Sequence, residues 1–250
     1  MQRIIISLML FTALFSCKQE SLETTKDKAQ FIVDQAIKTH GGEAYEQLEV
    51  SYKFRKGTYS IHNQGAEFEY TRSFEKDGQR IKDIVNNAGF ERQIDGQTIS
   101  VPDTMVARYS GSVNSVNYFA QLPYHLNDAA VNKTYEGTTT IKDKTYQVVK
   151  VTFDEAGGGE DFDDVYYYWF AAENYQLDYL AYSFHVNKGG VRFRSAYNIR
   201  TIDGIRFQDY VNYKAAKDTP LADLPKLYEA GELEELSRIE LENIEVKRAE

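Results

Sequence analysis

Alternation of apolar and polar residues dominates the chain beyond residue 50 and predicts a succession of short β-strands. Successive side chains of an extended chain point to opposite faces, so a period of two marks a strand with one buried face. By this criterion the predicted strands cover residues 50–61, 67–74, 80–85, 90–94, 98–101, 131–135, 138–142, 145–153, 165–170, 176–184, 191–200, 205–213 and 236–246. Turn residues separate them, as in Asp95-Gly96 and Asp203-Gly204, so we expect neighbouring strands to pair as antiparallel hairpins.

Residues 29–37 follow a helical period instead, with apolar side chains along one side, and a short helical turn is expected at 45–48. Gly41-Gly42 is expected to end the first helix. The run His40-Gly41-Gly42 could also suggest a metal or phosphate site. A helix cap accounts for the glycines, however, and the favourable field at a helix C-terminus accounts for the histidine.

Two further helices are predicted within the strand series. Residues 103–122 repeat apolar side chains at helical spacing, with Asp103 as the expected N-cap and Pro123 at the end. A second, shorter helix is expected within 219–231. About eleven strands with two or three helices indicate a mainly β (α+β) chain. An antiparallel sheet of that many strands is expected to curl rather than to stay open and flat.

The first 27 residues have a different character from the rest of the chain. Residues 1–16 combine a basic start with an apolar stretch at 4–15 that is too short to span a membrane, which is typical of a signal peptide. Residues 18–27 are polar and predict a flexible tether, so residues 28–250 are expected to form one domain.

The only cysteine, Cys17, directly follows Leu14-Phe15-Ser16. This arrangement resembles the bacterial lipobox, which implies that Cys17 is acylated and that residues 17–27 form a lipidated N-terminus. Two or more acyl chains give stable membrane attachment, where one chain gives only reversible attachment. The alternative is an ordinary secretory peptide that happens to end at a cysteine.

Composition excludes some classes of function. The formal net charge is −9, and basic residues are not concentrated, so nucleic acid is not expected as a partner. With 19 Tyr and 14 Phe, the chain has the aromatic content that favours strands.

The segment 165–170 (VYYYWF) carries bulky side chains on both faces of its strand. It predicts either a central strand covered on both sides or a wall of an apolar cavity, and the two interpretations are compatible. As residues of such a cavity we predict Tyr167, Trp169, Phe193, Tyr197 and Phe207.

Charged residues suggest three further candidates. The acidic loop 154–164 favours a solvated hairpin loop, with a calcium site as the alternative. Arginines 192, 194 and 200 share one strand face and are expected on the wet side, pairing with Asp178, although clustered cations could also bind anionic headgroups. Asp209 interrupts an apolar face, so either a β-bulge turns it outward or it is a buried carboxylate.

No template for catalysis fits. Residues 73–76 match a serine-x-x-lysine pattern but lie on a predicted strand without the companion motifs. The histidines, at positions 40, 62, 125 and 185, have no spacing suited to zinc. We therefore expect no catalytic residue, no metal, no cofactor and a monomeric protein that is not an enzyme.

Two local motifs carry a resemblance to a known family: Phe119–Tyr124 followed by Leu126, and Gly189–Arg194 leading to Gly204–Phe207. The layout adds to these motifs: an acylated N-terminus, a helix ending in His40-Gly41-Gly42 and a long meander. On both grounds the chain resembles an uncharacterised family of outer-membrane lipoproteins similar to the LolA/LolB lipoprotein carriers.

The resemblance implies an incomplete barrel with helices on its concave side that shelters acyl chains or another apolar molecule. Because Cys17 resembles an anchor and Lys18 is not aspartate, it also implies an anchored acceptor or sensor in the outer membrane. The chain has no obvious apolar hairpin loop like the one LolB uses for membrane handover, which argues against transfer. The competing hypothesis is a structural module that docks an envelope protein or glycan through its outer surface.

Overall fold

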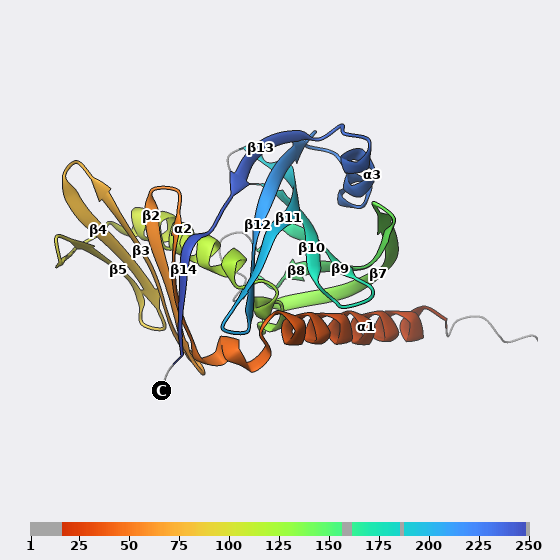
Figure 1. Ribbon diagram of the computed structural model, residues 1–250, viewed down its shortest axis with the longest axis horizontal. Helices are drawn as coiled ribbons and strands as arrows, with labels where there is room; N and C mark the ends of the chain where they lie inside the picture. The colour runs from red at the N-terminus through yellow and green to blue at the C-terminus, as the bar shows by residue number, and fades with distance from the viewer. Residues whose placement is uncertain (1–16, 157–161, 186–187, 249–250) are drawn as a thin grey trace, which may run out of the picture.

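The chain folds into two antiparallel sheets of seven strands each, in a computed structural model that describes residues 17–156, 162–185 and 188–248 (Figure 1). The first sheet contains, in spatial order, β14 (Glu242–Arg248), β1 (Leu48–Phe54), β2 (Gly57–Gln64), β3 (Glu67–Lys76), β4 (Gln79–Asn86), β5 (Gly89–Ile94) and β6 (Gln97–Ile99). The second sheet contains β13 (Glu234–Ile239), β12 (Ile205–Ala215), β11 (Gly190–Ile202), β10 (Leu177–Phe184), β9 (Val165–Ala171), β8 (Lys144–Phe153) and β7 (Val131–Ile141). Neither sheet closes into a barrel, so the predicted mainly β fold, an incomplete barrel with helices, is confirmed.

The helices of the described residues are α1 (Cys17–His40), α2 (Asp103–Ala120) and α3 (Leu224–Glu229), with the short 3-10 helices η1 (Gly42–Gln47), η2 (Tyr124–Asn127) and η4 (Leu221–Asp223). Helix α2 lies between the two sheets, and α3 covers the far side of the second sheet (Figure 1). The long helices predicted around 29–37 and 103–122 are therefore confirmed.

Most predicted strands are confirmed, and the exceptions have local causes. The predicted strand 50–61 is divided into β1 and β2 by a tight turn in which Arg55 takes a positive φ of 55°. The segments 131–135 and 138–142 form one strand, β7, because a β-bulge carries the pairing past Glu136. The predicted strand 236–246 is divided between the two sheets, and the buried Leu241 lies at the crossing.

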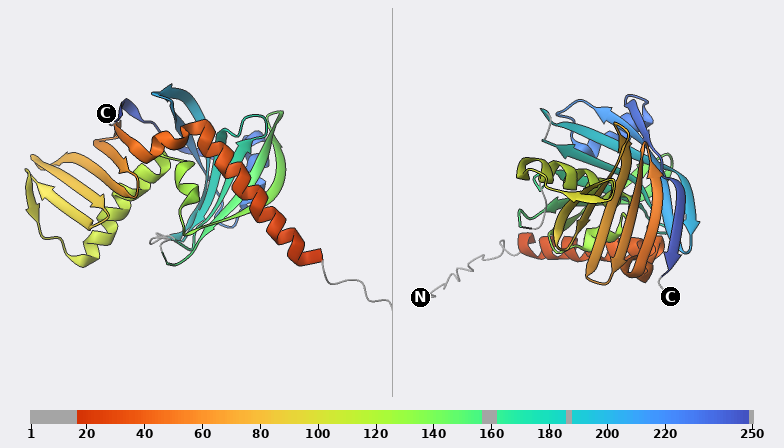
Figure 2. Two further views of the ribbon diagram at one scale, coloured as in Figure 1. Left: turned by 90° about the horizontal axis from the view of Figure 1, so that it is seen from below. Right: turned by 90° about the vertical axis from the view of Figure 1, so that its left-hand side faces the viewer.

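Helix α1 packs its predicted apolar stripe against the second sheet, mainly on β7 and β12. Ile32, Val33 and Ala36 are buried there, and Figure 2 shows the helix crossing this sheet. The helix ends at His40, and the N–H of the following residue, Gly41, donates to the Ile37 carbonyl oxygen. The predicted C-terminal cap is therefore confirmed.

The start of α1 differs from the expectation, because residues 18–27 are helical in the structure rather than a flexible tether. Lys, Gln, Glu and Leu predominate in this segment and are strong helix formers, so a helix held by the packing of residues 29–36 extends through it at low cost. Among the described residues, no helix has both the length and the apolar character needed to cross a membrane. The predicted signal peptide, residues 1–16, lies outside the described residues.

Helix α2 contacts β2, β3 and β4 of the first sheet. Its side facing that sheet is buried at Val113 and Asn117, and the Tyr52 hydroxyl donates to Asn117 Oδ1 at 2.8 Å. The prediction of Asp103 as N-cap is wrong: Asp103 lies in the first turn, Pro102 holds the cap position, and no side chain caps the helix there.

Strand β9 carries bulky side chains on both faces, and both faces are covered. On the face that we call inner, Tyr168 and Phe170 belong to the core beneath α1. On the opposite, outer face, Trp169 belongs to the core beneath η4 and α3, together with Leu224. The interpretation of residues 165–170 as a central strand is therefore confirmed.

Candidate ligand-binding cleft

A cleft with a volume of about 400 Å³ lies between the inner face of the second sheet, the C-terminal half of α2 and the end of β1. Its apolar lining includes Val116, Phe119, Tyr166, Tyr182, Phe184 and Leu241. Pockets for small molecules typically have volumes of about 300 to 1,000 Å³ and mainly apolar and aromatic walls. The cleft has the size and the lining of a site for an apolar molecule.

The aromatic wall of the cleft follows from the strand register. Tyr166 of β9 lies directly opposite Tyr182 of β10, and their rings stack with centroids 5.2 Å apart. Phe119 of α2 adds a third ring, 6.0 Å from Tyr182. Burial, together with the Asp164 carboxylate, raises the pKa of Tyr166, so its hydroxyl is neutral at physiological pH.

Two arginines of β11 bring positive charge into this apolar site. Arg192 and Arg194 alternate with Val191 and Phe193, which face the core on the outer side. The Arg194 guanidinium lies over the Phe119 ring at 4.1 Å. The cleft therefore combines apolar walls with positive charge from the buried Arg194 and the half-buried Arg192.

Two polar atoms in the cleft are buried without a hydrogen-bond partner, namely Arg194 Nε and Asn212 Oδ1. The two residues lie directly opposite each other on β11 and β12. Buried polar groups in native proteins are nearly always hydrogen-bonded, so each such atom needs an explanation.

The arginine stripe was predicted on the wet side of the sheet, and this prediction is wrong for Arg194, which is only 8% exposed. The predicted partner, Asp178, instead contacts Lys144 Nζ at 3.0 Å and Arg206 Nη2 at 3.5 Å. Arg200 leaves the face of the other two because a bulge shifts the β11 register between Tyr197 and Arg200.

Asp209 is a buried carboxylate, 2% exposed, and is not turned outward. It accepts hydrogen bonds from Asn198 Nδ2 at 2.6 Å, Arg200 Nη2 at 3.0 Å and the Leu241 N–H at 2.9 Å. The expected bulge exists, but on β11 rather than on β12, where it brings Arg200 to the carboxylate. The prediction that a bulge turns Asp209 outward is therefore wrong.

The five residues predicted to line a cavity do not meet in this cleft. Tyr167, Trp169 and Phe193 lie on the outer face of the second sheet, where Trp169 and Phe193 contact each other at a centroid distance of 5.8 Å. Phe207 is buried where β12 meets the first sheet, and the Tyr197 hydroxyl donates to Glu240 at 2.7 Å. None of the five is among the residues that line the cleft, and their role in binding stays a prediction.

Both faces of β9 are apolar, so alternation cannot tell which face borders a cavity. On the neighbouring strand β11, the sequence does distinguish the two faces. The inner face of β11 carries arginines where its outer face carries Val191 and Phe193. A polar or charged side chain that is buried in an apolar wall is a more informative observation than a further buried aromatic residue.

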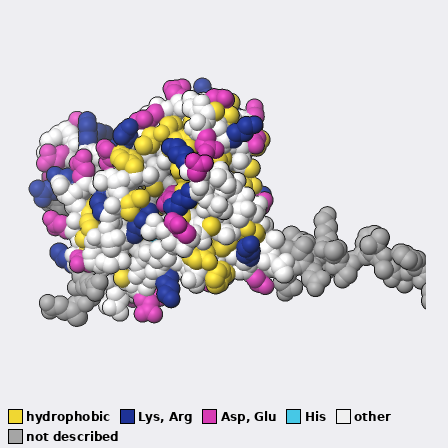
Figure 3. Space-filling model, turned by 45° about the vertical axis from the view of Figure 1, so that its right-hand side comes forward, with side chains coloured by type: hydrophobic (Ala, Val, Ile, Leu, Met, Phe, Trp, Pro, Cys, Tyr) yellow, Lys and Arg dark blue, Asp and Glu magenta, His cyan; other side chains and the backbone are white. Residues whose placement is uncertain are grey.

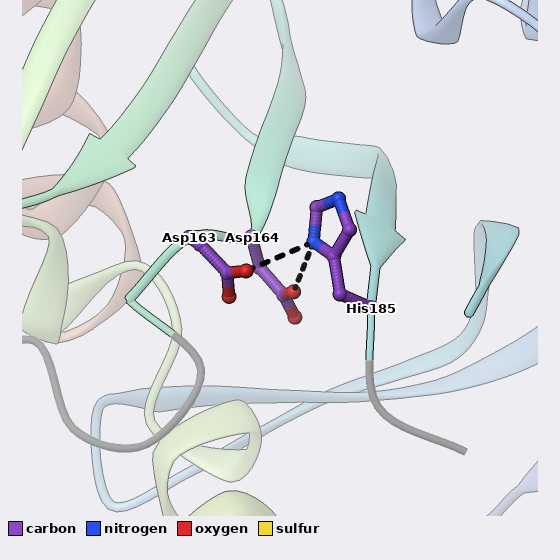
Figure 4. A group of neighbouring side chains, drawn as sticks. All are labelled: Asp163, Asp164 and His185. Carbon is purple, nitrogen blue, oxygen red and sulfur yellow. Dashed lines mark ion pairs between the residues drawn. The ribbon is translucent and has the colours of Figure 1, made fainter. Parts of the chain in front are cut away.

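A second cluster of polar side chains, formed by Asp163, Asp164 and His185, lies where β9 begins and β10 ends (Figure 4). The His185 Nδ1 atom is 3.3 Å from Asp163 Oδ2 and 3.8 Å from Asp164 Oδ1. Carboxylate and imidazole groups are ligands of Zn²⁺, so these three residues could hold a divalent cation. Sequence spacing missed the cluster because hairpin pairing, not chain neighbourhood, brings His185 to the aspartates.

The calcium alternative for loop 154–164 falls partly outside the described residues, since positions 157–161 are not described. Within the described part, Asp154 accepts a hydrogen bond from Asn132 Nδ2 at 2.7 Å, whereas Asp163 and Asp164 lie near His185. The acidic residues at the two ends of this loop thus have separate partners.

Comparison with known proteins places the fold. The sequence model of a family of unknown function (DUF6503) matches residues 3–241. A LolA superfamily protein from Nitrosomonas europaea has a similar structure, with a TM-score of 0.52, 12% sequence identity, and coverage of 89% of this chain and 94% of that one. The predicted resemblance to the LolA-like fold is thereby confirmed.

Two other solved structures are less similar to this chain. One is a DUF1329 family protein from Desulfovibrio piger, with a TM-score of 0.40, 12% sequence identity, and coverage of 86% of this chain and 92% of that one. The other is a putative outer membrane lipoprotein-sorting protein domain from Vibrio parahaemolyticus, with a TM-score of 0.36, 9% sequence identity, and coverage of 75% of this chain and 86% of that one. No curated protein matches the chain.

Proposed function

The chain belongs to the DUF6503 family, and we propose that it is a lipoprotein of the bacterial envelope that holds an apolar ligand, such as a lipid or acyl chain, in the cleft beside α2. The observation that carries this proposal is the cleft itself, about 400 Å³ in volume with a wall of stacked aromatic rings. A site of this kind gains affinity by removing apolar surface of the ligand from water.

The LolA-like fold supports the proposal, since the similar structure from Nitrosomonas europaea belongs to the LolA superfamily. The lipobox-like sequence that ends at Cys17 supports attachment to a membrane, most consistently the outer membrane. An anchored protein of this kind acts as an acceptor or sensor of its ligand and has no catalytic role. We propose that it works as a monomer.

The test uses the full-length chain and the neutral fluorescent dye Nile red as the apolar probe. Val116→Trp on α2 places a large side chain in the cleft and is expected to weaken Nile red binding about tenfold or more, because the substitution removes the space for the probe. Arg108→Trp, at an exposed position of the same helix, is the matched control and should leave the Kd unchanged.

Native mass spectrometry followed by lipid extraction gives an independent measurement on protein purified from bacteria. A co-purified apolar molecule, lost in Val116→Trp and kept in Arg108→Trp, is the expected result. Equal Nile red affinity in all three proteins, with no co-purified molecule, would reject ligand carriage and favour a docking module that uses its outer surface.

A further inference from the structure

We infer that the ligand of the cleft is an amphiphile whose head group carries an anionic group, carboxylate or phosphate, and a neighbouring hydroxyl. Arg194 would bind the anion and Asn212 would accept from the hydroxyl. The inference rests on the proposed function, and the geometry of these two side chains carries it.

Arg194 is held in place but not neutralised. Its Nη2 donates to the Tyr182 hydroxyl at 3.1 Å, and its guanidinium lies over the rings of Phe119 and Tyr182 at 4.1 Å and 5.2 Å. Stacking on aromatic rings fixes the plane of the guanidinium and leaves its edge available. Its Nε has no hydrogen-bond partner, although the residue is only 8% exposed.

The charge of Arg194 also lacks a carboxylate partner. Of the ion pairs within 4.0 Å between described residues, none involves Arg194 or the neighbouring Arg192. A buried cation without a counter-ion is costly, and an anionic group of a ligand removes that cost. The hydrogen bonds that Arg194 would form with such a group are charge-assisted and therefore strong.

The charge of the cleft is opposite to that of the molecule. Its charged lining consists of Arg55, Arg192 and Arg194 against a single carboxylate, Asp164, whereas the chain as a whole has a net charge of −9. The face shown in Figure 3 carries acidic and basic side chains interspersed. Asp164 has a partner in His185, whose Nδ1 lies 3.8 Å from its Oδ1.

Asn212 supplies the second half of the site. It is 7% exposed, lies opposite Arg194 in the strand register, and donates through Nδ2 to Ser237 Oγ at 3.2 Å. Its Oδ1 is buried and unpaired, so it needs a donor. A hydroxyl next to the anionic group of a ligand would satisfy it, and a bare carboxylate would not.

Four acyl probes of equal chain length separate these contributions. Palmitate carries only the anion, 1-palmitoyl lysophosphatidate carries the anion and a hydroxyl, 1-monopalmitoylglycerol carries hydroxyls alone, and methyl palmitate carries neither. Each probe competes with Nile red on the full-length chain below its micelle-forming concentration. We expect palmitate to bind about tenfold or more tightly than methyl palmitate, and lysophosphatidate to bind most tightly of the four.

Substitutions assign the preference to the two residues. Arg194→Met is expected to reduce the palmitate-to-methyl palmitate affinity ratio to about one, and Arg194→Lys to restore part of it, since lysine keeps the charge without the guanidinium fork. Asn212→Leu should remove the advantage of lysophosphatidate over palmitate. Arg80→Met, which removes an exposed arginine from β4, is the control for net charge and should change neither ratio.

The outcomes distinguish this inference from the proposed function. If all four probes bind the unsubstituted chain equally, the anionic head group is rejected while ligand carriage stands. If no probe binds and Nile red does not bind either, the proposed function fails. Should Arg194→Met fail to fold by circular dichroism, the probe ratios of the unsubstituted chain and of Arg194→Lys still decide.

Discussion

His40, the last residue of α1, shows how burial decides the charge of a side chain in this protein. The field of a helix C-terminus favours a cation, but His40 is only 1% exposed, and its Nδ1 donates to the Ala36 carbonyl oxygen at 2.7 Å. Burial, with a smaller effect of the nearby Arg206, lowers the pKa of His40 to about 3. The imidazole is therefore neutral in the folded protein, and the loss of solvation outweighs the helix field.

This shift predicts a pH dependence of stability. Below pH 6.5 the unfolded chain binds a proton at His40 that the folded chain does not bind until the pH approaches 3. The free energy of unfolding should therefore fall as the pH falls through this window, by about 2 kcal/mol between pH 7 and pH 5 from this residue alone. Urea titrations of the unsubstituted chain and of His40→Asn measure it.

Other groups titrate in both proteins, so the effect of His40 is the difference between the two proteins in how the free energy of unfolding changes with pH. His40→Asn should show the smaller decrease of stability between pH 7 and pH 5. The same pH dependence in the two proteins would mean that His40 binds a proton equally well in the folded and unfolded states.

Asp83 is a second residue whose contribution to the free energy of unfolding depends on burial. It is fully buried on β4, accepts from Arg92 Nε at 2.6 Å and Nη2 at 2.9 Å, and also pairs with Arg72. Arg92 itself is 8% exposed and stacks on Tyr109 at 3.4 Å. Breaking a buried pair by removing one charge leaves the other uncompensated, at a cost of about 3 to 5 kcal/mol.

Asp83→Asn should therefore lower the free energy of unfolding by about 3 kcal/mol or more, measured by urea titration. The exposed pair of Lys247 and Glu49, 3.3 Å apart, is the control. Glu49→Gln is expected to cost less than about 1 kcal/mol, because water screens that pair. Similar costs for the two variants would contradict the role assigned to burial.

At the scale of elements, α1 is held by apolar packing rather than by its intrinsic helix preference. Ile32 is 2% exposed and lies in the core shared with β8, β9 and β10, while Phe31 on the other side of the helix is 53% exposed. Ile32→Ala removes buried methyl groups and is expected to destabilise the protein by about 2 to 5 kcal/mol. Phe31→Ala should cost about 1 kcal/mol or less, since the side chain is more than half exposed and its ring contact with Tyr175 is edge-on.

Thermal unfolding followed by circular dichroism measures both variants of α1. A small effect of Ile32→Ala would show that α1 contributes little to the stability of the second sheet. A large effect of Phe31→Ala would show that the exposed side of the helix is packed in solution.

At the scale of the whole molecule, the anchor that we propose at Cys17 would determine where the cleft lies relative to a membrane. Helix α1 begins at Cys17, so acyl chains on this residue would attach the domain to a membrane through a helix. Cys17→Ser in the full-length chain should move the protein from the membrane fraction to the soluble fraction of a bacterial lysate. Intact-mass analysis should show an acyl mass on the unsubstituted protein only. An unmodified cysteine in membrane-bound protein would reject the anchor.

The sequence by itself determined the order and type of most elements. Strand periodicity and turn residues such as Asp203-Gly204 act over a few residues, and so does the apolar stripe of residues 29–37, so they can be interpreted without the fold. The division of 236–246 between two sheets could not be predicted, because no glycine or proline marks it and the Leu241 N–H at the crossing bonds to Asp209, which is distant in the sequence.

Only the tertiary structure decided the site. Both faces of the second sheet are apolar, and the choice between them depends on where α2 and α3 pack, far away in the sequence. For the same reason, strand pairing was needed to show that Arg194 is buried opposite Asn212. It was also needed to show that His185 lies near Asp164. Local patterns specify which face of an element is apolar, but long-range packing specifies what that face contacts, and the chemistry of a site depends on the contacts.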